Sequence, residues 1–241
     1  MLVGISFAKA FAYSLNIPII PVNHLSGHIA ANYSVFHELK PPFLSLVISG
    51  GHTHLVDVKT YTDMEIIGKT RDDAVGEAFD KIARVLGLGY PGGPIIDKLA
   101  YEGQNIIPIP YPEVPDLDFS FSGIKTSIIN LHHKDPNIDI KDVATSFQTR
   151  ITEILYDKSL KALKETGYKT MVIAGGVSAN SHIREHFKKL ENNGIKVYFP
   201  PMNLCTDNAA MVAIQGYYNL DSGIVENLDM NAVPNLKIGE I

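Results

Sequence analysis

A buried strand that ends in two glycines and runs directly into a helix is the feature that most constrains this chain. The segment KTMVIAGGVSAN, residues 169–180, has this form, and an amphipathic helix over about residues 141–166 precedes it. Helix, strand, glycine turn and helix in this order are typical of α/β proteins that bind a ligand at the end of a strand. The chain is therefore predicted to be an α/β protein with a ligand site at this turn.

Gly-Gly pairs also stand at two other predicted element ends. Gly50-Gly51 follows the apolar run FLSLVIS, and Gly92-Gly93 follows a predicted helix over residues 74–86. Two adjacent glycines let backbone N–H groups approach a phosphate or carboxylate closely, because no Cβ intervenes. A single pair is often only a tight turn. Three pairs, two of them beside polar residues, favour a nucleotide-sized ligand.

The other elements follow from apolar periodicity and turn residues. Phe7, Phe11 and Leu15 recur at helical spacing, and IPIIPV after them is predicted to be a short buried strand. The remaining predicted elements are a hairpin of FLSLVIS and THLVDV, a third strand MEIIGK, a helix PIIDKLAYEG, an irregular connection over 103–118, a helix FSFSGIKTSIINLHH, a last strand IKVYFPP and a last helix TDNAAMVAIQGYY.

Composition excludes several classes of protein. The 241 residues are 45% hydrophobic and 20% charged, as is ordinary for a folded globular protein. The net charge of −5 argues against bulk electrostatic binding of nucleic acid, which would need a local basic cluster, such as Arg184, Lys188 and Lys189, or a partner. The single cysteine, Cys205, excludes an internal disulfide framework and is expected to be buried. The chain lacks an apolar run of about 18 residues and a basic signal region, so we expect a cytoplasmic protein and no membrane span.

Two histidines in NHLSGHIAANY are candidate metal ligands. His24 and His28 lie four residues apart, so on a helix they would share one face one turn apart, close enough to bind the same ion. Spacing alone leaves open that both are structural histidines. Leu25 follows His24 where an HExxH metalloprotease has its catalytic Glu, so that chemistry is not supported. Asp207, at the start of a predicted helix, is a candidate third ligand or an N-cap.

Acidic side chains crowd the start of the predicted helix over 74–86. Asp72, Asp73 and Glu77 fit simple capping and a solvated face, since the helix dipole favours negative charge there. Asp80 follows Glu77 on the same face and is a candidate for contact with ligand hydroxyl groups. His52 and His54, two residues apart on a predicted strand, are candidates to line the same cleft.

Six blocks of sequence occur in a fixed order over essentially the whole chain. They are VNHLSGHIAANY, VISGGHTHLV, DDAVGEAFDKIARVLGLGYPGGPIID, DFSFSGIKT, MVIAGGVSANSHIR and CTDNAAMVA. Together they closely resemble the bacterial tRNA adenosine threonylcarbamoyltransferase family, formerly described as O-sialoglycoprotein endopeptidases. The resemblance implies the two-lobed α/β fold shared by actin, sugar kinases and heat-shock ATPases, called the ASKHA fold, with a ligand cleft between the lobes.

The resemblance also implies functional residues. His24, His28 and Asp207 would hold one divalent metal ion, with Fe²⁺ expected and Zn²⁺ as the alternative. The residues implied to bind threonylcarbamoyl-AMP are Val47, Ile48, Ser49, Gly50, Gly51, Asp80, Gly93, Asp97 and Asn180. No nucleophile is implied, and His52 is the one candidate considered for catalytic proton transfer.

The reaction implied is transfer of the threonylcarbamoyl group from threonylcarbamoyl-AMP to N6 of the adenosine next to the anticodon, in tRNAs that read codons beginning with A. The metal would act as a Lewis acid, and the glycine turns would stabilise charge as AMP leaves. Expected partners are tRNA, a paralogous subunit and a P-loop ATPase of the same modification complex.

The predicted domains follow from the same resemblance. Residues 1–41 are expected to be a remnant of the N-terminal lobe, 42–203 the C-terminal lobe, and 204–241 a closing helix and tail that return to the lobe interface. Family members carry further chain before the position of Met1, so we expect a fragment, a misassigned start or a degenerate paralogue with exposed apolar surface.

Two other functions remain open from the sequence. An ATPase or sugar kinase of the same superfamily would use carboxylates to manage Mg²⁺ and would not need the HxxxH pair. A truncated, non-catalytic binding paralogue would have no need to keep all three candidate metal ligands, whereas the missing N-terminal segment favours this alternative.

Overall fold

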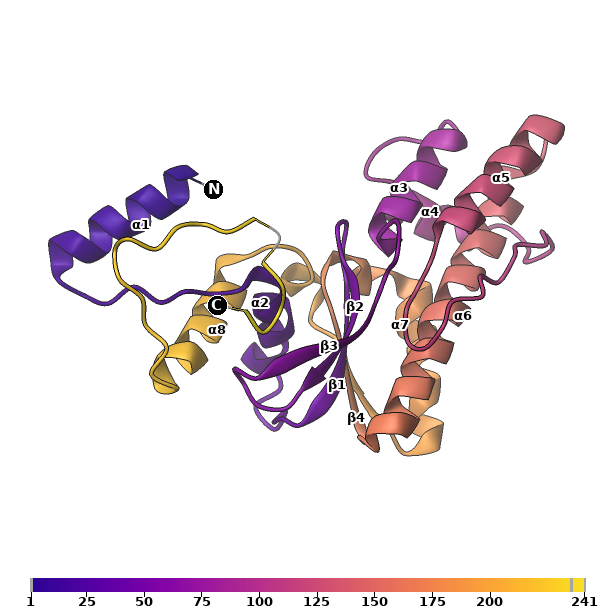
Figure 1. Ribbon diagram of the computed structural model, residues 1–241. Helices are drawn as coiled ribbons and strands as arrows, with labels where there is room; N and C mark the ends of the chain where they lie inside the picture. The colour runs from indigo at the N-terminus through magenta and orange to yellow at the C-terminus, as the bar shows by residue number, and fades with distance from the viewer. Residues whose placement is uncertain (1, 235, 241) are drawn as a thin grey trace.

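A five-stranded mixed sheet forms the centre of the molecule (Figure 1). The computed structural model describes residues 2–234 and 236–240. The strand order is β3-β2-β1-β4-β5, with β1 antiparallel to β2 and parallel to β4. In chain order the elements are α1 (Leu2–Leu15), α2 (His24–Ala30), η1 (Ala31–Ser34), β1 (Phe43–Ile48), β2 (Thr53–Val58), β3 (Met64–Lys69), α3 (Val75–Val85), α4 (Gly92–Ala100), α5 (Ser122–Lys134), α6 (Ile140–Thr166), β4 (Thr170–Ala174), η2 (Gly176–Ala179), α7 (Ser181–Phe187), η3 (Lys188–Asn193), β5 (Lys196–Tyr198), η4 (Met202–Leu204) and α8 (Ala209–Asp221).

The central strand β1 divides the core into two layers. Side chains alternate between the faces of a strand, so Leu44, Leu46 and Ile48 enter one hydrophobic cluster while Phe43 and Val47 enter the other. Every residue of β1 is buried, because helices cover both faces of the sheet. The run FLSLVI is therefore continuously apolar apart from one serine, whose hydroxyl donates a hydrogen bond to a backbone carbonyl of β4.

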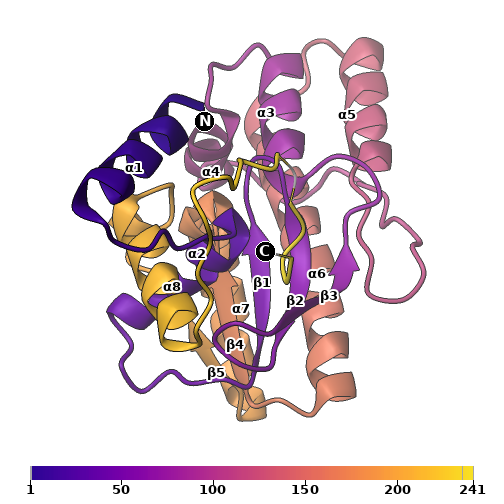
Figure 2. The same cartoon turned by 60° about the vertical axis from the view of Figure 1, so that its left-hand side comes forward.

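Helices from the two ends of the chain share one face of the sheet. α2 and α8 pack against each other and lie together on this face, whereas α3, α4, α6 and α7 lie on the opposite side (Figures 1 and 2). The division predicted at residues 41 and 203 stays a prediction. The structure shows that α2, before residue 41, and α8, after residue 203, pack together in one layer on the same face of the sheet.

The predicted α/β class is confirmed, as are most of the predicted elements. The hairpin, the third strand, the long helix now seen as α6 and the strand before the third glycine pair all form where expected. The prediction of a buried strand at IPIIPV is wrong: Ile19 makes only an isolated bridge to Glu226. Pro18 and Pro21 lack the N–H that a sheet ladder needs, so this segment instead connects α1 to α2.

Helix α1 forms as its apolar spacing predicts, but it lies apart from the sheet (Figure 1). Ala12 is the one residue of α1 that is buried, and the rings of Phe7 and Phe11 stack on each other at 6.2 Å while remaining largely exposed. Its apolar periodicity therefore correctly indicates a helix, although that face meets no core in the described part of the chain.

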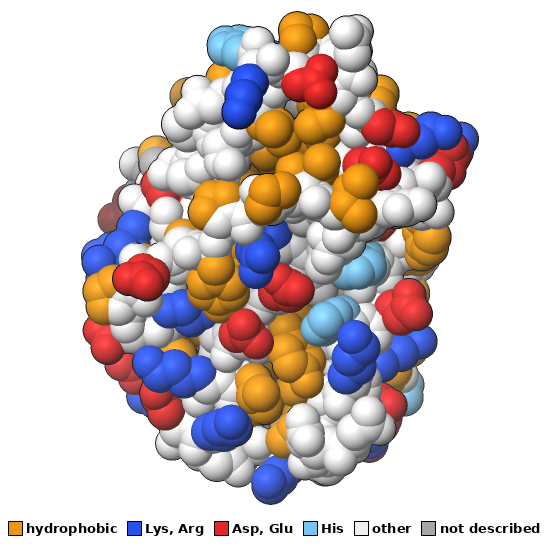
Figure 3. All heavy atoms as spheres, turned by 90° about the vertical axis from the view of Figure 1, so that its right-hand side faces the viewer, with side chains coloured by type: hydrophobic (Ala, Val, Ile, Leu, Met, Phe, Trp, Pro, Cys, Tyr) orange, Lys and Arg blue, Asp and Glu red, His pale blue; other side chains and the backbone are white. Residues whose placement is uncertain are grey.

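The surface over the α5 and α6 side carries interspersed acidic and basic side chains, with a hydrophobic group in its upper half (Figure 3). Neither sign of charge dominates this face, in keeping with the modest net charge. Among residues 2–234 and 236–240, no helix combines the length and apolar character needed to cross a membrane.

We expect the core around β1 to dominate stability. Replacing the fully buried Leu46 by Ala should lower the free energy of unfolding by roughly 2–5 kcal/mol, because the removed methyl groups leave a cavity in a tightly packed layer. Leu220→Ala, at a side chain that is 49% exposed, is the matched control and should cost less than about 0.5 kcal/mol. Urea denaturation of both variants tests this, and equal losses would contradict the layer assignment.

Candidate functional site

The carboxyl ends of two parallel strands meet at the centre of the sheet. Val47 of β1 lies opposite Ala174 of β4, so the turns that follow these strands are neighbours. Gly175 has φ +90°, and a Cβ there would lie 2.4 Å from the carbonyl oxygen of Ile48. Only glycine allows this close approach. The juxtaposition opens a pocket at the point where open α/β sheets usually bind ligands.

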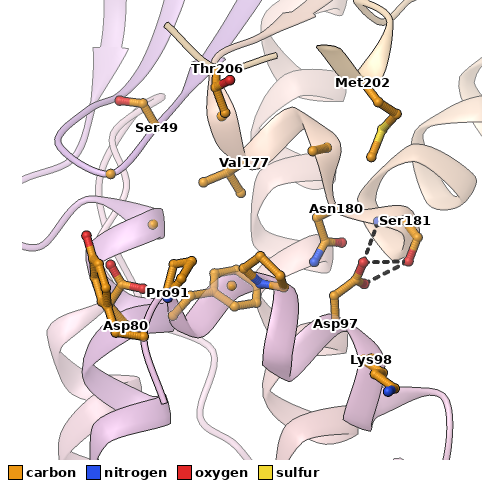
Figure 4. Close-up of a pocket in the computed structure, with 18 of the residues that line it drawn as sticks. Ser49, Asp80, Pro91, Asp97, Lys98, Val177, Asn180, Ser181, Met202 and Thr206 are labelled. Carbon is orange, nitrogen blue, oxygen red and sulfur yellow. Dashed lines mark hydrogen bonds between the residues drawn. The ribbon is translucent and has the colours of Figure 1, made fainter. Parts of the chain in front are cut away.

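The pocket has a volume of about 960 Å³. Residues after β1, from α3 and α4, from the turn after β4 and from the segment before α8 all contribute to it (Figure 4). Its lining is His28, Ser49, Gly50, Gly76, Phe79, Asp80, Tyr90, Pro91, Gly93, Pro94, Asp97, Lys98, Tyr101, Gly176, Val177, Ala179, Asn180, Ser181, Met202, Thr206 and Asp207. The size and the mixture of apolar surface with a few polar groups suit a nucleotide-sized ligand.

Hydrogen bonds between α4 and the start of α7 fix one wall of the pocket. The Asp97 carboxylate accepts from the Ser181 backbone N–H at 3.0 Å and from its hydroxyl at 2.7 and 2.8 Å (Figure 4). Asn180 caps α7 through its side-chain oxygen and donates to the Gln148 side chain of α6 at 2.7 Å. Asp97 and Asn180, both predicted from the sequence, are thus held rigidly at the pocket.

The two glycines of the second pair have different surroundings. A Cβ on Gly92 would lie 2.6 Å from the Ala83 Cβ and 2.7 Å from the Phe79 carbonyl oxygen, so this glycine permits close packing of α4 on α3. Gly93 lines the pocket, and apart from its own helix no heavy atom of the described residues lies within 4 Å of the equivalent position. Asp80 also lines the pocket and accepts a hydrogen bond from the Gly92 N–H at 2.7 Å.

The remaining residues predicted to bind the nucleotide lie along and after β1. Ser49 and Gly50 line the pocket, and the Ser49 hydroxyl accepts from the backbone N–H of Gly51 and His52. The side chains of Val47 and Ile48 are fully buried in the two core layers. Gly51, like these two, is not among the lining residues, so in the described chain these three lie behind the pocket surface.

The two hairpin histidines pack against each other at the start of β2. The rings of His52 and His54 meet edge to face at 5.4 Å, and within the described residues neither lines the pocket. Burial, followed by the neighbouring His24, lowers the pKa of His52. Burial, followed by His52, lowers the pKa of His54 to about 4. Both rings are therefore neutral near pH 7.

Three side chains converge beside the pocket in a geometry that fits a metal ion. The Asp207 Oδ1 atom lies 3.4 Å from His24 Nε2 and 3.3 Å from His28 Nε2, and the three donor atoms lie within 4.8 Å of one another. Donor atoms about 2.1 Å from a tetrahedral zinc ion lie roughly 3.4 Å apart. The two separations from Asp207 match this value, whereas the overall spread of up to 4.8 Å means that the donors would draw closer together around an ion. Two imidazoles and one carboxylate are three ligands, one fewer than a four-coordinate metal ion needs.

The surroundings of the two histidines differ. The His28 side chain is 2% exposed, and burial, followed by the neighbouring His24, lowers its pKa, which favours the neutral imidazole that binds metals. His24 is 52% exposed and Asp207 77% exposed. The N-cap of α2 is Asn23, whose side-chain oxygen accepts from the Leu25 N–H and so fixes the turn that carries both histidines.

Asp207 is not the cap of α8, the alternative role considered for it from the sequence. Asn208 takes that position and accepts from the Met211 N–H at 2.9 Å, which leaves the Asp207 carboxylate directed at the histidines. The acidic group before α3 is likewise not a set of caps for that helix. Asp72 accepts from Ser120, Phe121 and Ser122 at the start of α5, and Asp73 pairs with Lys81 and Lys125.

Other pocket residues were missed by sequence reasoning. Ser181, Thr206 and Met202 enter the lining only because the turns after β4 and β5 fold toward each other. The serine directly after Asn180 was the one visible signal, since a second polar residue at a helix start often binds a neighbouring element. Nothing in the local sequence distinguishes Thr206 or Met202.

Similarity to solved structures defines the class of protein. HypF of T. kodakarensis superposes with a TM-score of 0.71 at 15% identity, over 90% of this chain and 39% of that one. At this identity the likeness shows the fold alone, which is the ASKHA fold of actin-like proteins. The molecule is thus an ASKHA-type α/β protein with a nucleotide-sized pocket and an adjoining His/His/Asp group.

Sequence similarity then narrows the class to one family. Residues 1–214 match the sequence model of TsaD, tRNA N6-adenosine threonylcarbamoyltransferase. Proteins of that name from Clostridioides difficile and Clostridium novyi are 53% and 49% identical to the chain, over all of its length and 73% of theirs. The chain belongs to the tRNA N6-adenosine threonylcarbamoyltransferase family, as the six sequence blocks predict.

We expect the two glycines of the second pair to respond differently to substitution. Gly92→Ala should destabilise the protein by roughly 1–3 kcal/mol, since its Cβ would overlap α3. Gly93→Ala should leave stability nearly unchanged, because its Cβ would project into open space, yet it should weaken binding of AMP. Thermal melting and AMP titration of both variants separate the two roles. Equal effects of the two substitutions on melting would contradict them.

Proposed function

We propose that this protein transfers the threonylcarbamoyl group from threonylcarbamoyl-AMP to N6 of the adenosine next to the anticodon in tRNA. The tRNAs would be those that read codons beginning with A. Family membership supports this proposal. Its strongest structural support is that one pocket is bordered both by the glycine turns and by the His/His/Asp group, since His28 and Asp207 line it together with Gly50 and Gly93.

The acyl-adenylate would bind across the strand ends. The backbone around Gly50 and Gly93 is free of side chains and can approach a phosphate closely. The carboxylates of Asp80 and Asp97 keep lone pairs available for ribose hydroxyls beyond the hydrogen bonds they already accept. Asn180 would contact the nucleotide beside Asp97. Held in this way, the acyl group would point toward His28 and Asp207.

The His/His/Asp group would hold one divalent ion. When bound, such an ion polarises a carbonyl oxygen as a Lewis acid. His24, His28 and Asp207 would fix its position at the edge of the pocket, and the donor set of two imidazoles and one carboxylate suits Fe²⁺ or Zn²⁺ better than Mg²⁺ or Ca²⁺. We propose Fe²⁺ as the physiological ion.

The chemistry then depends chiefly on placement. An adenine amine is a weak nucleophile, so holding it in line with an activated acyl carbon supplies much of the rate. Backbone N–H groups of the glycine turns would stabilise negative charge on the departing phosphate. The proton released from N6 needs an acceptor, and His52, neutral near pH 7 and just behind the Ser49 turn, is the proposed candidate.

Recognition of tRNA would need more than this chain's overall charge. Arg184, considered from the sequence as part of an RNA-binding cluster, is engaged with backbone carbonyls, whereas Lys188 and Lys189 are exposed. Two lysines supply little phosphate binding. We therefore propose that a paralogous subunit and a P-loop ATPase of the modification complex take part.

Transfer of labelled threonylcarbamoyl from its adenylate to tRNA tests the proposal. The protein, supplied with its proposed partner subunits, should modify a tRNA that carries adenosine next to the anticodon and leave unmodified the same tRNA with guanosine there. Phosphate release from ATP without any tRNA modification would instead favour an ATPase or kinase. Tight adenylate binding without transfer would favour a non-catalytic paralogue.

We expect the His/His/Asp group, also called the metal group below, to control both the metal content of the protein and its transfer activity. His24→Ala and Asp207→Asn change exposed side chains, so both variants should fold while binding Zn²⁺ at least about ten-fold more weakly and losing most transfer activity. His37→Ala, at an exposed histidine outside the pocket, is the control and should behave as wild type. Metal analysis after chelation and reloading measures the first effect. Unchanged metal content in both site variants would remove these residues from the proposal.

A further inference from the structure

The Arg184 side chain connects two loops that border the pocket. Its Nε donates to the Ser178 carbonyl at 2.7 Å, and one terminal nitrogen donates to the Pro200 carbonyl at 2.6 Å and lies 3.2 Å from the Cys205 sulfur. The guanidinium also stacks over the Phe199 ring, 5.0 Å from its centroid. One planar group thus contacts the turn after β4 and the chain after β5 at once.

The chain after β5 has little regular structure of its own. Residues 199–208, here named the Asp207 segment, lie between the end of β5 and the start of α8, and their backbone hydrogen bonds are local, as from Leu204 to Pro201. The buried residues of this segment are Pro200 and Cys205, and both contact Arg184. Arg184 therefore holds the two points at which the segment enters the protein interior.

The Asp207 carboxylate depends on this segment for its position. It is 77% exposed, and its ion-pair partners among the described residues are the two histidine rings. The segment is otherwise anchored at its end, where Asn208 caps α8 and donates to the Leu204 and Thr206 carbonyls. The third donor of the metal group is thus placed by contacts that other residues make.

The chemistry of Arg184 suits such a positioning role. None of the ion pairs among the described residues includes it, so its partners are carbonyl oxygens and a sulfur rather than a carboxylate. The guanidinium offers donors from separate nitrogen atoms in fixed directions, whereas the ammonium of lysine offers its donors from a single nitrogen atom. On the opposite side, Ser178 belongs to η2, whose neighbours Val177 and Ala179 line the pocket.

We infer that Arg184 is a positioning residue for the metal group, acting through the Asp207 segment. Its contacts set the distance of the Asp207 carboxylate from His28. Because Arg184 also binds η2, this distance depends on the position of the pocket wall there. This inference rests on the proposed function, because it takes the His/His/Asp group to be a metal site. It assigns to Arg184 a role in metal affinity although its side chain touches none of the three donors.

The test is the affinity of the purified protein for Zn²⁺, measured by competition with a chromogenic chelator. Arg184→Ala should bind Zn²⁺ about ten-fold more weakly than wild type, in the range typical of residues that orient metal ligands. Arg184→Lys should fall between them, because one ammonium replaces only part of the contacts. Arg150→Ala is the matched control, since Arg150 also makes a close hydrogen-bonded contact and lies over an aromatic ring, but its partners, Glu153 and Tyr111, lie outside the Asp207 segment.

Melting temperature and circular dichroism of each variant separate positioning from general loss of structure. Weaker Zn²⁺ binding by folded Arg184→Ala, with unchanged binding by Arg150→Ala and recovery of transfer at high Zn²⁺, supports the inference. Wild-type affinity in folded Arg184→Ala or Arg184→Lys overturns it while leaving the metal site intact. Wild-type protein that binds Zn²⁺ no better than His28→Ala overturns the proposed metal site, and this inference with it.

Discussion

Parallel pairing of β1 with β4 is the interaction on which the rest of the structure depends. It brings the ends of two strands, separated by more than a hundred residues in sequence, to the same edge of the sheet. The close approach of Gly175 to the Ile48 carbonyl then allows both turns to open into one pocket. A side chain at Gly175 would separate these turns, because its Cβ would overlap the neighbouring strand's backbone and its φ is unfavourable for other residues.

The two faces of the sheet divide the functional groups between them. On one face, α3 and α4 carry Asp80 and Asp97, and Asn180 caps α7, so three of the residues proposed to bind the nucleotide lie here. α2 on the other face, with the segment before α8, carries the three proposed metal ligands. Both groups of residues lie at the same end of β1. Threonylcarbamoyl-AMP bound to the first group would therefore present its acyl group to the proposed metal ligands. Arg184 contacts both pocket borders from α7.

Much of this architecture was predictable from local patterns. Continuous apolar strands, glycine pairs and the periodicity of α6 indicated the α/β class and most elements, since burial on two faces leaves a clear trace in composition. The strand predicted at IPIIPV does not form, because its two prolines lack the N–H groups that a complete ladder of strand hydrogen bonds needs. The spacing of α1 alone did not predict its exposure, since an apolar helix face has the same spacing whether or not it is covered. Exposed apolar surface was expected instead from the family resemblance.

By itself the sequence determined most of the elements, the glycine turns, the HxxxH pair and the family, because each is a property of short segments. It did not decide between a ligand and a cap for Asp207, because that choice depends on whether Asn208 takes the cap position. It also did not decide which of two adjacent glycines, 92 and 93, serves packing and which borders the pocket. Only the tertiary structure decided these points, since each depends on atoms that distant parts of the chain bring within a few ångströms.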